Sequence, residues 1–139
     1  MNKRLSTTIL LCLGLLCTLT AMASTFTATA EKDTKTIYAF GFGETLNDTM
    51  TFLSPVQVLE GAETDKSGFL IFREEYATQL QQHLSEQYGK TTMCVLIYAT
   101  SRDKAEKKYV RLRRELQRRP HTKLVEMPVN EFQFARRPE

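Results

Sequence analysis

Two carboxylates and one histidine are of the residue types that general acid–base chemistry requires. Glu44 and Asp48 follow the apolar run of residues 37–43, and His83 lies in a segment with helical spacing. Such groups transfer protons when the fold brings them within hydrogen-bonding distance of a substrate. Acidic residues between strands serve turns equally well, because their side chains bond to the local backbone. One hypothesis is therefore a small ligand-binding or hydrolase-like enzyme with its site near these three residues.

Cys94 is a further candidate nucleophile, and it lies in the apolar run of residues 93–99. A thiol becomes nucleophilic when a nearby histidine takes its proton. In the middle of a strand, however, a cysteine more often packs as a small hydrophobic residue, so we expect a buried and inert thiol. His83 and His121 form no H-x-x-x-H pair, and the chain has no C-x-x-C. The sequence therefore indicates no catalytic residue, no metal site and no cofactor.

The strongest binding signal is the cationic segment of residues 102–119, which contains nine basic and three acidic residues. An apolar stripe recurs in it at spacings of four, three and four, formed by Ala105, Tyr109, Leu112 and Leu116. This spacing predicts a helix with one buried face. Six cations fall outside the stripe and are the candidate binding residues: Lys104, Lys107, Lys108, Arg111, Arg114 and Arg118.

An exposed cationic face of this kind attracts an acidic envelope protein, or an anionic membrane or glycan surface. Nucleic acid is disfavoured as a partner, because the face lacks aromatic residues that stack on bases. The alternative is a face that is only solvated, with ion pairs between residues four apart, such as Asp103–Lys107 and Glu115–Arg119.

The first 23 residues have the pattern of a signal peptide. Lys3 and Arg4 precede an apolar run over residues 9–19, and Ala21-Met22-Ala23 matches an A-x-A cleavage site. We expect cleavage after Ala23, with retention as an anchor as the alternative, and no transmembrane segment after cleavage. The expected product is exported to the periplasm or cell surface. It comprises a disordered lead over residues 24–35, one domain over 36–135 and a polar tail over 136–139.

Periodicity and turn residues predict the elements of this domain. Residues 37–43 alternate between bulky aromatic side chains and small ones, which indicates a strand with one bare face. Residues 50–59 form a second apolar run that Pro55 interrupts, because proline cannot donate to a strand ladder. The remaining predictions are helices over residues 73–88 and about 102–119, and strands over 93–99, 122–127 and 131–135.

This order, β-β-α-β-α-β, predicts a single small α+β domain. We expect a mixed sheet of about four to five strands, with two helices packed mainly on one face. The unbroken apolar run of residues 93–99 is typical of a strand covered on both faces, so we place it at the centre of the sheet.

The pattern resembles small exported proteins of unassigned function common in Bacteroidota. The resemblance rests on the phenylalanine/glycine first strand and on four motifs: Phe52-Leu53-Ser54, Arg73-Glu74-Glu75-Tyr76, Cys94-Val95-Leu96 and Ala105-Glu106-Lys107-Lys108-Tyr109. It implies a periplasmic or outer-surface location and leaves activity open. Because the sequence lacks a nucleophile–base pair or a metal set at recognisable spacing, we favour a non-enzymatic binding or assembly module of the bacterial cell envelope. Its contact surface would be the basic helix or a sheet edge.

Overall fold

The computed structural model describes residues 35–135 of the chain. The predicted signal peptide, nearly all of the lead and the polar tail lie outside the described residues. The elements are β1 (Ile37–Thr45), β2 (Met50–Leu53), β3 (Gln57–Leu59), α2 (Arg73–Tyr88), β4 (Thr92–Ala99), α3 (Arg102–Arg118) and β5 (Lys123–Glu126). They form a single small α+β domain with two helices and a mixed five-stranded sheet, which confirms the predicted fold class.

β1 is the interior strand of the sheet. One of its edges pairs antiparallel with β4 over eight residue pairs, from Tyr38–Ala99 to Thr45–Thr92. Its other edge pairs antiparallel with β3 in its first half and with β2 in its second half. β5 then adds to β2 in parallel. The prediction that residues 93–99 form the central strand is therefore wrong, because β4 has only β1 as a neighbour within the described residues.

The second apolar run forms two strands, β2 and β3, where the predicted order counted one, and the interruption expected at Pro55 separates them. The Ser54 N–H donates to the carbonyl of Gly41 at 2.9 Å. The Gly41 N–H in turn donates to the Ser54 hydroxyl at 2.7 Å. Ser54 is completely buried. Its side chain thus supplies the acceptor that β1 needs where the neighbouring strand is broken.

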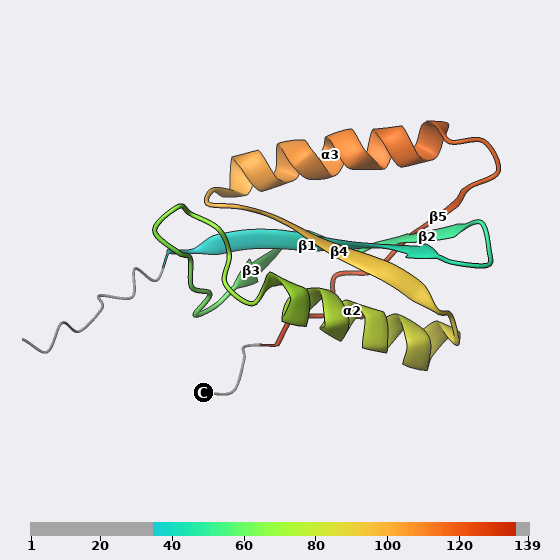
Figure 1. Ribbon diagram of the computed structural model, residues 1–139. Coiled ribbons are helices and arrows are strands. Elements are labelled where there is room, and N and C mark those ends of the chain that lie inside the picture. The colour runs from blue at the N-terminus through green and yellow to red at the C-terminus, as the bar shows by residue number, and fades with distance from the viewer. Residues whose placement is uncertain (1–34, 136–139) are drawn as a thin grey trace, which may run out of the picture. The chain divides into compact units, whose positions relative to one another are not determined.

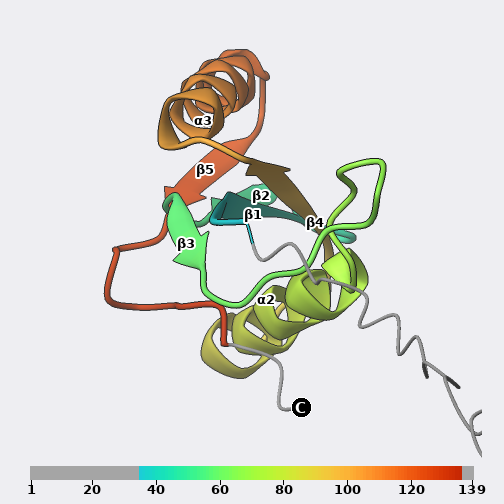
Figure 2. The ribbon, with the colours of Figure 1, turned by 90° about the vertical axis from the view of Figure 1, so that its left-hand side faces the viewer.

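The two helices lie on opposite faces of the sheet, α3 above it and α2 below it in Figure 1, and the view in Figure 2 shows the same separation. Phe40 of β1 packs edge-on against Tyr109 of α3, with ring centroids 5.3 Å apart. On the other face, a Cβ atom added to Gly41 would overlap Leu80 of α2. The placement of both helices mainly on one face is therefore corrected. Both faces of β1 are apolar, because one carries aromatic rings and the other has glycines that let a helix approach the backbone. Each face is therefore buried against a helix.

Residues 131–135 do not form the predicted last strand. They run as an irregular strap beside α2 and β3, held by two side-chain amides. The Gln57 amide donates to the carbonyl of Phe132 and accepts the Phe134 N–H, both at 3.0 Å. The Gln79 amide binds the backbone of Ala135 in the same two-fold way. Glutamine side chains thus take the place of a neighbouring strand, so the backbone is satisfied without a ladder.

Candidate functional site

α3 begins at a capped turn beside the end of β4. The Ser101 hydroxyl accepts the N–H of Lys104 at 3.4 Å, and Asp103 lies in the first turn. Acceptors and acids at this position stabilise the unpaired N–H groups and the positive end of the helix dipole. Ala105 and Leu116 of the apolar stripe are completely buried, whereas Tyr109 and Leu112 are half-buried. The helix therefore has a fixed inner face and a fixed outer face.

Three contacts fix how the helix is rotated over the sheet. On one flank, the Lys108 ammonium donates to the carbonyl oxygen of Tyr98 in β4 at 2.9 Å. On the other flank, the Arg113 guanidinium donates to the Glu126 carboxylate of β5 at 2.7 Å, and this bond raises the pKa of Arg113. At the end of the helix, Arg119 pairs with Glu44 of β1. The Lys108 flank thus borders the outer edge of β4.

All six candidate binding residues lie on the exposed surface of α3: Lys104, Lys107, Lys108, Arg111, Arg114 and Arg118. We call this surface the cationic face. Arg111 pairs with Glu115 at 3.2 Å, although both side chains are more than half exposed. Within residues 35–135, the structure shows no carboxylate within ion-pairing distance of the other five cations of this face, Lys104, Lys107, Lys108, Arg114 and Arg118.

The cationic face is only partly neutralised by its own helix. Of the two predicted pairs, Asp103–Lys107 is not formed in the described part of the chain, and Arg119 binds Glu44 instead of Glu115. A shallow hollow on this face is lined by Lys107, Arg111, Arg114 and Arg118 together with Glu106, Glu115 and the half-exposed Val110. The hollow therefore combines positive charge with a small apolar area formed by Val110.

β4 presents an open edge next to the cationic face. The N–H of Leu46 donates to the carbonyl of Thr91 at 3.2 Å, which continues the ladder that joins β1 to β4. In an antiparallel pair, the backbone N–H and C=O groups of successive residues point alternately toward the partner strand and away from it. Every second residue of β4 therefore directs these groups away from β1. These are Thr92, Cys94, Leu96 and Tyr98. Within residues 35–135, the Lys108 ammonium is the one hydrogen-bond partner found for these outward backbone groups.

The side chains of β4 explain why this edge is unusual. Residues 92–99 contain no charged residue, no proline and no glycine. On the α3 side of the strand, Met93 is 64% exposed and Val95 is 45% exposed. The apolar run that suggested a doubly covered strand is thus partly open to solvent. Sequence reasoning missed this open edge, because the composition of the apolar run does not show which strands lie beside it.

Cys94 points to the α2 side of β4 and is half-buried, less than the sequence predicted. Its sulfur lies 3.4 Å from the hydroxyl of Thr92. Burial raises the pKa of the Cys94 thiol, which keeps it protonated at neutral pH. This environment suits an inert thiol better than a nucleophile.

The alternative site near Glu44, Asp48 and His83 is not brought together by the fold. Glu44 binds Arg119 on the α3 side of the sheet. Asp48 binds Lys90 at 2.8 Å, and this hydrogen bond lowers the pKa of Asp48. His83 lies on the α2 side, with its ring against Phe132 and its Nε2 atom 3.5 Å from Glu131.

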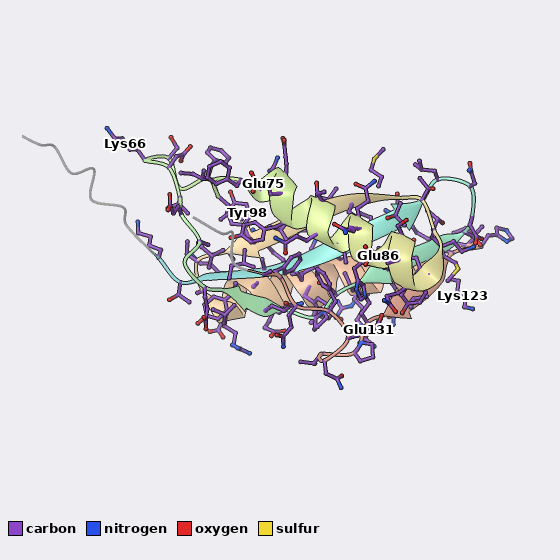
Figure 3. The ribbon with its side chains drawn as sticks, turned by 90° about the horizontal axis from the view of Figure 1, so that it is seen from below. Lys66, Glu75, Glu86, Tyr98, Lys123 and Glu131 are labelled. Atoms are coloured by element: carbon purple, nitrogen blue, oxygen red, sulfur yellow. The ribbon has the colours of Figure 1, made fainter. Side chains whose placement is uncertain are left out.

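A polar cluster that sequence reasoning did not identify links α2 to the strap. The Tyr88 hydroxyl donates to Glu131 at 2.7 Å, which raises the pKa of the tyrosine. Figure 3 views this side of the sheet and labels Glu131, and it labels Tyr98 near the beginning of α2. The hydrogen bond between Tyr88 and Glu131 fastens the strap to α2, whereas the buried Nε2 atom of His83 has no hydrogen-bond partner within residues 35–135. In residues 35–135 no group of three potential ligands is placed to hold a metal ion.

The comparisons with known proteins add no relative. No protein-family model, curated protein or solved structure matches the chain. Within residues 35–135, neither helix has the length and apolar composition needed to cross a bilayer.

Proposed function

We propose that this chain is a non-enzymatic binding module of the bacterial cell envelope, and that the cationic face of α3 contacts an acidic region of a partner protein. One observation carries the proposal: exposed cations without carboxylate partners gather beside an uncharged, open strand edge. Positive charge favours an acidic ligand and accelerates its encounter with the protein. The open edge favours a polypeptide over a lipid or glycan, because only a polypeptide offers a regular row of backbone N–H and C=O groups.

The location belongs to the proposal as well. It is supported by the signal-like sequence before Ser24. Fractionation of the native cells should find the protein outside the cytoplasm, and N-terminal sequencing should begin at Ser24. An intact Met1 on the cytoplasmic protein would contradict the proposed export.

Charge removal tests the contact surface. The triple variant Lys107→Gln/Arg114→Gln/Arg118→Gln removes exposed cations that hold no carboxylate in the described structure. At about 0.5 kcal/mol for each exposed charge, it should bind an oligoglutamate peptide about tenfold more weakly than the unaltered protein. Binding measured by fluorescence anisotropy should also weaken as salt concentration rises.

A matched variant controls for the change in net charge. Lys66→Gln/Arg73→Gln/Lys123→Gln removes the same number of cations from outside α3. It should keep the affinity of the unaltered protein for oligoglutamate. Equal losses in both variants would show that net charge alone drives the binding. Binding to phosphatidylglycerol vesicles without binding to oligoglutamate would favour a membrane over an acidic protein.

A further inference from the structure

The outer edge of β4 is built as an acceptor for one more strand. Thr92, Cys94 and Leu96 direct backbone N–H and C=O groups away from β1, and residues 35–135 supply no partner for them. Natural proteins protect long edges with charged side chains, prolines or bulges, because an open ladder recruits other strands. β4 has none of these, and its exposed Met93 and Val95 add apolar surface beside the ladder. The geometry at the edge therefore favours pairing with an extended segment.

The charged side chains on the two sides of this edge differ. On the α3 side, Lys108 already reaches the carbonyl of Tyr98, so its ammonium lies at the edge itself. Lys104 and Arg111 share this flank, because residues separated by three or four positions lie on one side of a helix. On the α2 side, a hollow beside Tyr98 is lined by Arg73 as well as by Glu74 and Glu75. An added strand would therefore meet several cations on one of its faces and charges of both signs at one end of the other.

We propose that β4 binds an extended acidic segment of a partner protein as an additional antiparallel strand, with the acidic side chains on the α3 side. This inference rests on the proposed function and specifies the conformation of the partner segment. Backbone hydrogen bonds to β4 supply the pairing, and the cations of α3 select the sequence. The acids lie opposite Met93, Val95 and Ile97, whereas the residues opposite Cys94 and Leu96 are uncharged and face α2.

A second copy of this chain fits the edge less well. An antiparallel pair of β4 strands related by a two-fold axis would place both α3 helices on the same side of the joined sheet. Their facing flanks would each carry Lys104, Lys108 and Arg111 against the single acid Glu115. Like charges at such short range oppose association. The protein should therefore sediment as a monomer, and a dimer in which the β4 amides are protected from exchange would overturn the proposal.

Strand pairing predicts which peptide amides matter. In the peptide Thr-Glu-Val-Glu-Val-Glu-Thr, alternate residues point their N–H groups in opposite directions. With the glutamates on the α3 side of an antiparallel pair, the valine and threonine N–H groups face β4 and the glutamate N–H groups face solvent. N-methylation of the valines and the second threonine should therefore weaken binding about tenfold or more, through lost hydrogen bonds and crowding. N-methylation of the glutamates should leave the affinity unchanged.

The experiment compares the unmodified and the two methylated peptides by fluorescence anisotropy, with hydrogen exchange of the protein as second readout. The unmodified peptide should slow exchange at the outward amides of Thr92, Cys94 and Leu96. Equal binding by both methylated peptides, a loss confined to the glutamate-methylated one, or no binding by the unmodified peptide would overturn the proposal. Binding of oligoglutamate that depends on the α3 cations would survive each of these results, so failure of strand addition is distinguishable from failure of the proposed function.

Discussion

Ser54 shows how one hydroxyl repairs a broken strand. Its oxygen accepts the buried N–H of Gly41 at 2.7 Å, at the point where β2 gives way to β3. Ser54→Ala removes this acceptor and leaves a buried donor unpaired, so it should lower the free energy of unfolding by about 1–3 kcal/mol. Urea denaturation measures the change.

Thr78→Ala is the matched control, because it deletes an exposed hydroxyl that donates to the Glu74 carbonyl within α2. That change should alter stability by no more than about 0.5 kcal/mol. Similar losses in the two variants would show that the Ser54 hydroxyl has no special role at the strand break.

The Cys94 thiol links burial to pH dependence. Burial raises its pKa, so the folded state holds the proton more tightly than the unfolded chain does. The contribution of the protonated thiol to the free energy of unfolding is complete below the pKa of Cys94 in the unfolded chain. It is lost as the pH rises through the pKa of Cys94 in the folded protein. At pH 8, iodoacetamide should modify the peptide that contains Cys94 more slowly in the native protein than in urea, as measured by mass spectrometry. Equal rates would contradict a protonated, protected thiol.

At the scale of the element, the buried face of α3 should determine stability, and the exposed cationic face should not. Leu116 is completely buried, and Leu116→Ala should destabilise the protein by about 2–5 kcal/mol. Arg114 is exposed on the cationic face, so Arg114→Gln should change stability by no more than about 0.5 kcal/mol. Thermal and urea denaturation of both variants checks the difference. A large loss of stability in Arg114→Gln would indicate that the cationic face serves the fold.

At the scale of the whole described domain, the strap closes the α2 side of the sheet. Phe132 is 7% exposed, and its ring packs against both Phe134 and His83. Phe132→Ala should therefore cost about 3–5 kcal/mol in stability, because it empties a packed site between distant parts of the chain. Native-state hydrogen exchange should also become faster in α2.

Val129→Ala provides the comparison just before the strap, since Val129 is 70% exposed. It should leave stability and exchange within about 0.5 kcal/mol of the unaltered protein. If Phe132→Ala behaved like Val129→Ala, the strap would contribute nothing to the fold.

Local patterns in the sequence determined most of the elements. The apolar stripe and the terminal glycine predicted α2 over residues 73–88, the bounds that the structure has. The alternation in residues 37–43 predicted the two unlike faces of β1. Pro55 predicted an interruption of residues 50–59, although the predicted order counted one strand where the structure has β2 and β3. The cations of α3 were also identified as exposed, because a charged side chain off an apolar stripe remains in water.

The tertiary structure alone decided how these elements are combined. Strand order depends on hydrogen bonds between residues far apart in the chain, and an apolar run such as 93–99 has the same composition at the centre of a sheet as at its edge. The position of α3 also depends on a distant contact, because Phe40 lies on the face of the sheet that α2 does not cover and packs there against Tyr109. Residues 131–135 became a strap because Gln57 and Gln79 satisfy their backbone groups. Local spacing carries no information about these distant partners, so the open edge beside a cationic helix appears only in the folded chain.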